Sequence, residues 1–230
     1  MKTILFKILR VIAIVLMGMT AAFTLMGGAG TVCVALAAER FGETMALITP
    51  YKWLYVLFVL ATLAVGVMGM RSLILLIKVR SGAYQAALVA LISGVVVGVV
   101  HIAASRLIRG ASMPVDAVVY TTLLTLIFFL ILRIPRIWNE IGFEKTSHDT
   151  DLPRSAAAAT LVLIGLLTLT VPYWAGPTHM FGGVNYADAW HTQLTIFGWG
   201  MLLLGIGLSA LPIIKRTLRQ PCAGLTARQA

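Results

Sequence analysis

The chain has 230 residues, of which 60% are hydrophobic and 11% charged, and its mean hydropathy is +0.95. Soluble domains carry about 25% charged residues, so this composition excludes a single water-soluble core and predicts an integral membrane protein. A net charge of +10 would suit a nucleic-acid partner in a soluble protein, but in a membrane protein it reports which loops face the cytoplasm, and we expect no nucleic-acid binding.

Hydropathy along the chain predicts an all-α fold, a polytopic bundle of six transmembrane helices that forms a single domain over residues 1–230. Each apolar stretch approaches the roughly 20 residues that a bilayer requires. The first is too long for a signal peptide, whose apolar region has roughly 7 to 15 residues, so we favour a retained helix over a cleaved signal. The predicted spans are 9–30, 53–77, 83–108, 115–132, 155–174 and 191–214.

The basic residues predict the orientation of these spans. With the N-terminus inside, fourteen of the eighteen Lys and Arg residues face the cytoplasm, as the preference for positive charge on that side requires. The sequence therefore predicts a multi-pass protein of the cell (inner or plasma) membrane with both termini inside. Its expected partners are the lipid bilayer and, as a further hypothesis, other membrane subunits. The basic residues left outside are Arg40, Lys52, Arg106 and Arg109.

Polar groups are scarce within the spans. No predicted span has an Asp or Glu near its middle, which argues against a proton pump or an ion-coupled transporter. The intramembrane threonines, such as Thr122 and Thr168, are expected to bond to their own helix or to a neighbour. The inner loop 136–154 fits either a short amphipathic segment at the interface or an ordinary polar loop.

Two histidines fall on glycine-lined helix faces. A period of 3.6 residues places Gly98 and His101 on one face of the third span, and His191 and Gly198 on one face of the sixth. Imidazole ligands above smooth faces are what haem b would need, so these four residues are candidate cofactor-binding positions. The alternative reading is close helix packing, with the histidines bonding across helices or to interfacial water.

The run from His191 to Trp199 is locally similar to histidine-led helix segments in haem-copper oxidases and nitric-oxide-response membrane proteins. In those proteins a second histidine stands two residues away, whereas this chain has Gln193 there. The similarity covers one helix of six and assigns no family.

Polar residues on the predicted outer side form a second candidate site for a ligand: His179, Asp188, Arg106 and Arg109. A histidine beside a carboxylate can move protons, and two arginines three residues apart can hold an anion. The alternative is that Asp188 caps the sixth helix and that both arginines interact with a helix C-terminus. No metal-ligand spacing and no known catalytic motif occurs.

The sequence thus predicts an integral membrane protein without an identifiable catalytic motif. This favours a non-enzymatic binding component over an enzyme. The leading hypothesis is a haem- or quinone-associated component of a membrane redox assembly. The alternative is a small membrane enzyme, or a solute-binding or transport protein, that uses the outward-facing His/Asp/Arg cluster.

Overall fold

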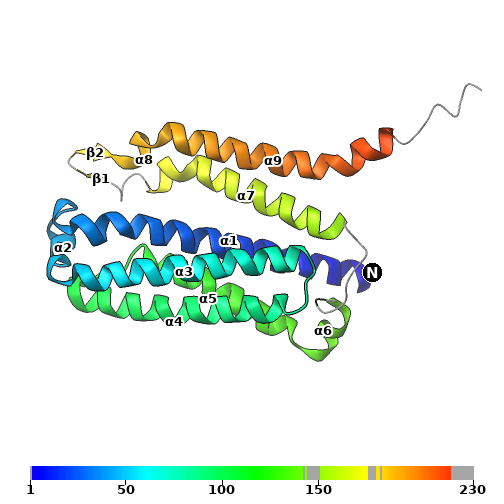
Figure 1. Cartoon of the computed structure of the whole chain (residues 1–230), viewed down its shortest axis with the longest axis horizontal. Coiled ribbons are helices and arrows are strands. Elements are labelled where there is room, and N and C mark those ends of the chain that lie inside the picture. Colours follow the sequence, from blue (N-terminus) through cyan, green and yellow to red (C-terminus); the bar gives the residue numbers. More distant parts are fainter. Residues whose placement is uncertain (1, 142, 144–150, 176–179, 182, 219–230) are drawn as a thin grey trace, which may run out of the picture.

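The computed structural model describes residues 2–141, 143, 151–175, 180–181 and 183–218, and it confirms the all-α bundle (Figure 1). Within these residues, six helices are long and apolar enough to cross a membrane. They are α1 (Lys2–Ala37), α3 (Lys52–Ile77), α4 (Ala83–Arg109), α5 (Val115–Leu132), α7 (Asp151–Ala175) and α9 (His191–Leu218).

The observed bounds lie within a few residues of the predicted ones, except at the start of the chain. The fourth predicted span coincides with α5, whereas α1 has 36 residues and is much longer than its predicted span. At 1.5 Å per residue, α1 is about 54 Å long, well beyond a hydrocarbon core of about 30 Å. Apolar residues separate the basic residues of the first turns, and the helix therefore begins several residues before the predicted span.

Short elements join the long helices at both ends of the bundle. The first connection, at the left of Figure 1, holds η1 (Ala38–Arg40), α2 (Glu43–Ala46) and η2 (Thr49–Tyr51). The hairpin of β1 (Met180–Phe181) and β2 (Val184–Asn185) lies at the same end, followed by α8 (Tyr186–Ala189). At the opposite end, the short helix α6 (Pro135–Ile141) forms the first part of the inner loop.

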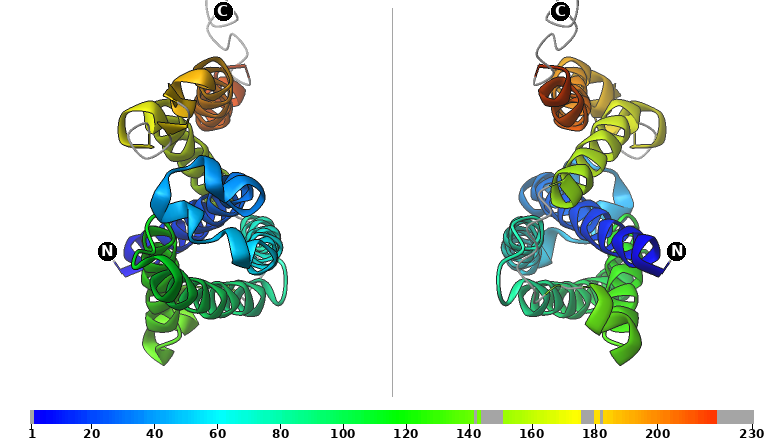
Figure 2. Two further views of the ribbon diagram at one scale, coloured as in Figure 1. Left: turned by 90° about the vertical axis from the view of Figure 1, so that its left-hand side faces the viewer. Right: turned by 90° about the vertical axis from the view of Figure 1, so that its right-hand side faces the viewer.

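The long helices form two groups. α1, α3, α4 and α5 pack in a closed ring of neighbours, and α7 lies against α1. α9 packs along α7, so the α7/α9 hairpin stands to one side of the four-helix unit (Figure 2). The described start of α1 and the end of α9 lie at the same end of the bundle (Figure 1), as an even number of spans requires.

The apolar core of the four-helix unit divides into two clusters. One, at the end where α6 lies, centres on Ile14, Leu76 and Phe129. The other, at the opposite end, contains Ala35, Ile48 and Tyr55. The cavity described next lies between these two clusters.

Candidate functional site

A cavity lies inside the four-helix unit, between the two apolar clusters. It spans about seven residues on α1, α4 and α5, or about 10 Å along the helix axes. Glycines, valines and threonines make up most of its wall, and His101 is its one titratable side chain. The lining residues are Thr24, Gly27, Thr31, Thr62, Val65, Gly94, Val97, Gly98, His101, Pro114, Val115, Val118, Val119 and Thr122.

His101 is held in an aromatic cage. Its ring stacks on Phe58 of α3, with 4.3 Å between centroids and 15° between planes. Tyr55 meets it edge-on, with centroids 5.4 Å apart. The Tyr55 hydroxyl shares a 2.8 Å hydrogen bond with the hydroxyl of Ser105, one turn further along α4 than His101. Ring packing and this interhelical bond therefore fix the position of the imidazole.

The nitrogens of His101 are available to a ligand. The side chain is only 4% exposed, yet it forms no hydrogen bond within the described part of the chain, and neither nitrogen is fully enclosed by protein. A neutral imidazole has one N–H donor and one acceptor nitrogen, and buried polar groups are nearly always hydrogen-bonded. Because the residue lines the cavity, water or a ligand in the cavity is the natural partner.

The threonines of the cavity present acceptors. The hydroxyls of Thr24, Thr31 and Thr122 donate to backbone carbonyls one turn earlier, at 2.7 to 2.8 Å. This confirms the expectation that such residues bond to their own helix. Each hydroxyl oxygen still has a lone pair that can accept a hydrogen bond. The wall therefore offers several acceptors together with the donor and the acceptor of His101.

The size of the cavity limits its occupant. The space open to the centres of water molecules is about 40 Å³, which is enough for about three of them. Three water molecules occupy roughly 90 Å³ in the liquid. That is the scale of a single six-membered ring, and it is far too small for a four-pyrrole macrocycle.

The structure does not support the haem hypothesis. His101 and His191 are not brought together, because α7 lies between α9 and the four-helix unit (Figure 1). His191 is also exposed. Neighbouring side chains already fill both glycine faces. A Cβ on Gly98 would overlap Val119, and one on Gly198 would come within 2.6 Å of Leu169. The alternative reading of these faces, close helix packing, fits both glycines.

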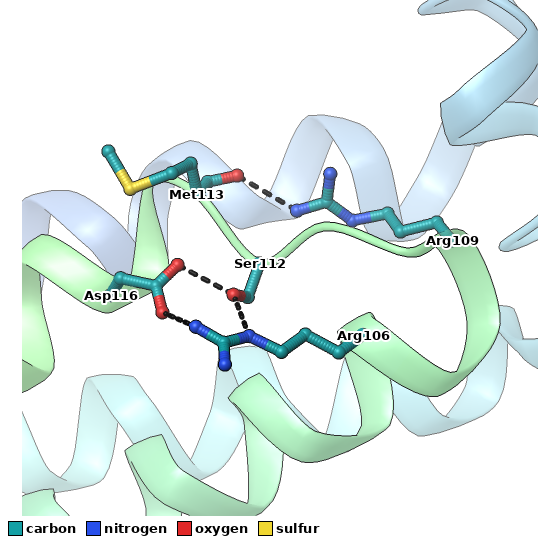
Figure 3. Close-up of polar contacts among 5 residues, drawn as sticks. All are labelled: Arg106, Arg109, Ser112, Met113 and Asp116. Carbon is teal, nitrogen blue, oxygen red and sulfur yellow. Dashed lines mark hydrogen bonds and ion pairs between the residues drawn. The ribbon is translucent and has the colours of Figure 1, made fainter.

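The outer polar cluster is largely engaged in structure. Arg106 donates from its terminal nitrogen to Oδ1 of Asp116 and from Nε to the hydroxyl of Ser112, both at 2.9 Å. Ser112 donates in turn to Oδ2 of Asp116 at 2.6 Å (Figure 3). The triangle joins the end of α4 to the start of α5 across a five-residue connection. Arg106 is therefore neutralised by the protein itself.

The remaining candidates of that cluster are dispersed. Asp188 is an exposed residue of α8, which contacts α7 and α9. Arg109 donates to the carbonyl of Met113 at 2.8 Å and stands apart from the Arg106 triangle (Figure 3). His179 lies outside the described residues. The alternative that placed both arginines at a helix C-terminus is consistent with their position in the last turn of α4.

The sequence reasoning found His101 and Gly98 but not the residues around them. Tyr55, Phe58 and Thr62 belong to α3, and the sequence pattern of α3 does not reveal which of its faces points to α4. The sequence does contain a signal for the contact between Arg106 and Asp116. A connection of five residues makes consecutive helices antiparallel neighbours and brings their ends together.

Comparison with known proteins adds no assignment. No protein-family model matches the chain. No curated protein and no solved structure is significantly similar to it. The function must therefore be argued from the cavity and its residues.

Proposed function

We propose that the protein is a membrane component that binds the headgroup of a quinone in the His101 cavity, as part of a redox assembly. The observation that carries the proposal is the buried imidazole of His101, which lines the cavity and forms no hydrogen bond with the residues that the structure describes. In an apolar bundle such a group is costly unless a ligand or water satisfies it.

The chemistry of a quinone suits this wall. The N–H of His101 would donate to a quinone carbonyl, and the hydroxyl of a reduced quinol could donate to a threonine oxygen. A single flat ring matches the volume of the cavity, and the stacking of His101 on Phe58 holds the imidazole in place at the cavity wall. Ligand pockets of this type are mostly apolar with a few placed polar groups.

Access from the bilayer is consistent with the wall. Gly27 and Thr31 on α1 and Val118 on α5 line the cavity and are only half-buried. A lipid-soluble ligand would enter between these two helices with its isoprenoid tail left in the membrane. Within the described residues no group of three or more metal-ligating side chains occurs, so an electron donor or acceptor would come from another subunit.

The test is a quinone titration of protein purified in mild detergent. Quenching of tryptophan fluorescence measures the binding of a short-chain quinone. Endogenous quinone is extracted with solvent and identified by its ultraviolet band before and after borohydride reduction. His101→Leu should weaken binding about tenfold, the loss expected for one or two hydrogen bonds in a dry site.

His191→Leu is the matched control, because it removes an exposed histidine from α9, outside the cavity. It should leave quinone affinity unchanged. Equal weakening by both substitutions, or wild-type protein that neither carries nor binds quinone, would overturn the proposal. A Soret band in the same spectra would revive haem as the ligand.

The orientation belongs to the same proposal. We propose that the end of the bundle holding the start of α1 and the end of α9 faces the cytoplasm, and that the membrane is the cell membrane. The sorting of basic residues supports this, since eleven of the fifteen Lys and Arg residues that the structure describes lie toward that end. The His101 cavity then lies in the outer half of the bilayer.

A further inference from the structure

The four basic residues at the proposed outer end differ in how their charge is balanced. Lys52 pairs with Glu39 at 2.8 Å, and Arg106 pairs with Asp116 at 2.9 Å. Within the described part of the chain, Arg40 and Arg109 have no carboxylate partner. Arg40 is exposed on η1, where water can solvate it fully. Arg109 is therefore the one partly buried cation at this end, among described residues, whose charge the protein leaves unbalanced.

The hydrogen bonding of Arg109 is also incomplete. A guanidinium has five N–H donors. One terminal nitrogen donates to the Met113 carbonyl at 2.8 Å, and Nε is enclosed without any acceptor. Figure 3 shows the guanidinium of Arg109 directed along the α4–α5 connection to the carbonyl of Met113 and not in contact with Asp116. The carboxylate in the first turn of α5, Asp116, is already shared by Arg106 and Ser112.

An apolar side chain lies next to this cation. Met113 is 61% exposed, and its carbonyl accepts a hydrogen bond from Arg109, so its side chain projects from the bundle near the guanidinium. At the end of a transmembrane helix such side chains lie among acyl chains, while an arginine reaches the headgroup level. The surroundings therefore combine an unbalanced guanidinium with a surface for hydrocarbon.

We propose that Arg109 binds the phosphate of a phospholipid in the outer leaflet, with an acyl chain packing on Met113. Guanidinium and phosphate form bidentate, charge-assisted hydrogen bonds. Here they would use the N–H groups of the two terminal nitrogens that remain after the bond to Met113. Arg106 cannot take this role, because its pairing with Asp116 and Ser112 holds the α4–α5 connection together. Arg109 is not among the residues that line the His101 cavity, so different variants test the lipid site and the quinone site.

The experiment is native mass spectrometry of detergent-purified protein titrated with a phospholipid. The wild-type protein should retain one lipid adduct more tightly than the rest. Arg109→Gln should weaken that adduct about tenfold or more, the loss expected for a charge-assisted pair. Arg40→Gln is the matched control, with the same charge change at the same end, and should retain the adduct.

A conservative variant distinguishes the loss of lipid binding from misfolding. Arg109→Lys keeps the charge but loses the planar pair of donors, so its lipid retention should fall between wild type and Arg109→Gln. Retention by Arg109→Gln or Arg109→Lys equal to the wild type would overturn the proposal, as would an equal loss in Arg40→Gln. Inorganic phosphate is the second arm. If it displaces the lipid adduct at concentrations close to those of the lipid, the site takes soluble phosphate and the lipid assignment is wrong.

Discussion

Arg106 and Asp116 are ten residues apart in the chain, yet their side chains form a 2.9 Å ion pair that closes the turn between α4 and α5. The carboxylate is 7% exposed and the guanidinium 58% exposed, so the pair lies half in and half out of the protein. Ser112 completes the arrangement by bonding to both partners. This triangle fixes the start of α5, and Val115, Val118 and Val119 of that helix line the His101 cavity.

Asp116→Asn should therefore destabilise the protein. The substitution keeps the shape but removes the charge that faces Arg106 and one of the acceptors shared with Ser112. We expect a loss of about 1–3 kcal/mol, measured as a lower thermal unfolding midpoint in detergent. A double-mutant cycle with Arg106→Gln isolates the pair. If the two losses simply add, the coupling assigned to this ion pair is absent.

Gly98 provides a second test, because it sets the distance between α4 and α5. A Cβ at this position would overlap a methyl group of Val119. Gly98→Ala should cost about 1–3 kcal/mol through this overlap, measured by thermal unfolding. Adding Val119→Ala should recover part of the loss, since it removes the overlapping methyl group. No recovery in the double variant would show that α5 does not approach α4 as described.

Much of the fold could be predicted from the sequence, because span length and hydropathy are local properties. The bounds of α5 and the shared face of Gly98, His101 and Ser105 follow from apolar length and helical period alone. The buried positions of those three residues confirm that face.

The arrangement of the helices could not be predicted in the same way. Both α3 and α9 are strongly apolar, so hydropathy does not say which of them lies beside α4. The glycine face of α9 suggested that His191 lies near His101, but that face packs against α7. In lipid, apolar side chains are tolerated on every face, which removes the amphipathic signal that orients helices of soluble proteins. Phe58, which stacks on His101, was missed for this reason.

The α7/α9 hairpin depends on backbone-to-backbone packing. A Cβ on Gly205 would lie 2.8 Å from the carbonyl oxygen of Ala158 and 3.0 Å from the backbone nitrogen of Val162. Backbone atoms cannot turn aside, so Gly205→Ala should separate the helices and cost about 1–3 kcal/mol. Gly207→Ala is the control, since nothing lies within 4 Å of its Cβ, and it should be neutral or slightly stabilising. Thermal unfolding of the two variants compares them, and equal midpoints would contradict this packing.

The two cysteines test the orientation. Cys33 is exposed and lies four residues before the end of α1, at the end of the bundle that we propose to be outside. Cys222 follows α9, whose end we propose to be inside. In intact cells a membrane-impermeant maleimide should therefore label Cys222→Ser, which keeps Cys33. It should label Cys33→Ser only after the membrane is permeabilised.

A second probe strengthens the outer assignment, because Cys33 lies about 6 Å along the axis from the helix end and lipid could shield it. Glu43 is exposed on α2, in the connection between α1 and α3, so Glu43→Cys in a variant lacking both native cysteines should label in intact cells. Labelling at Cys222 but not at Glu43→Cys would invert the topology and place the His101 cavity in the inner half of the bilayer. Labelling of both from one side would contradict the six-span count. Five of the six spans lie between α2 and Cys222, and an odd number of crossings places these two positions on opposite sides of the membrane.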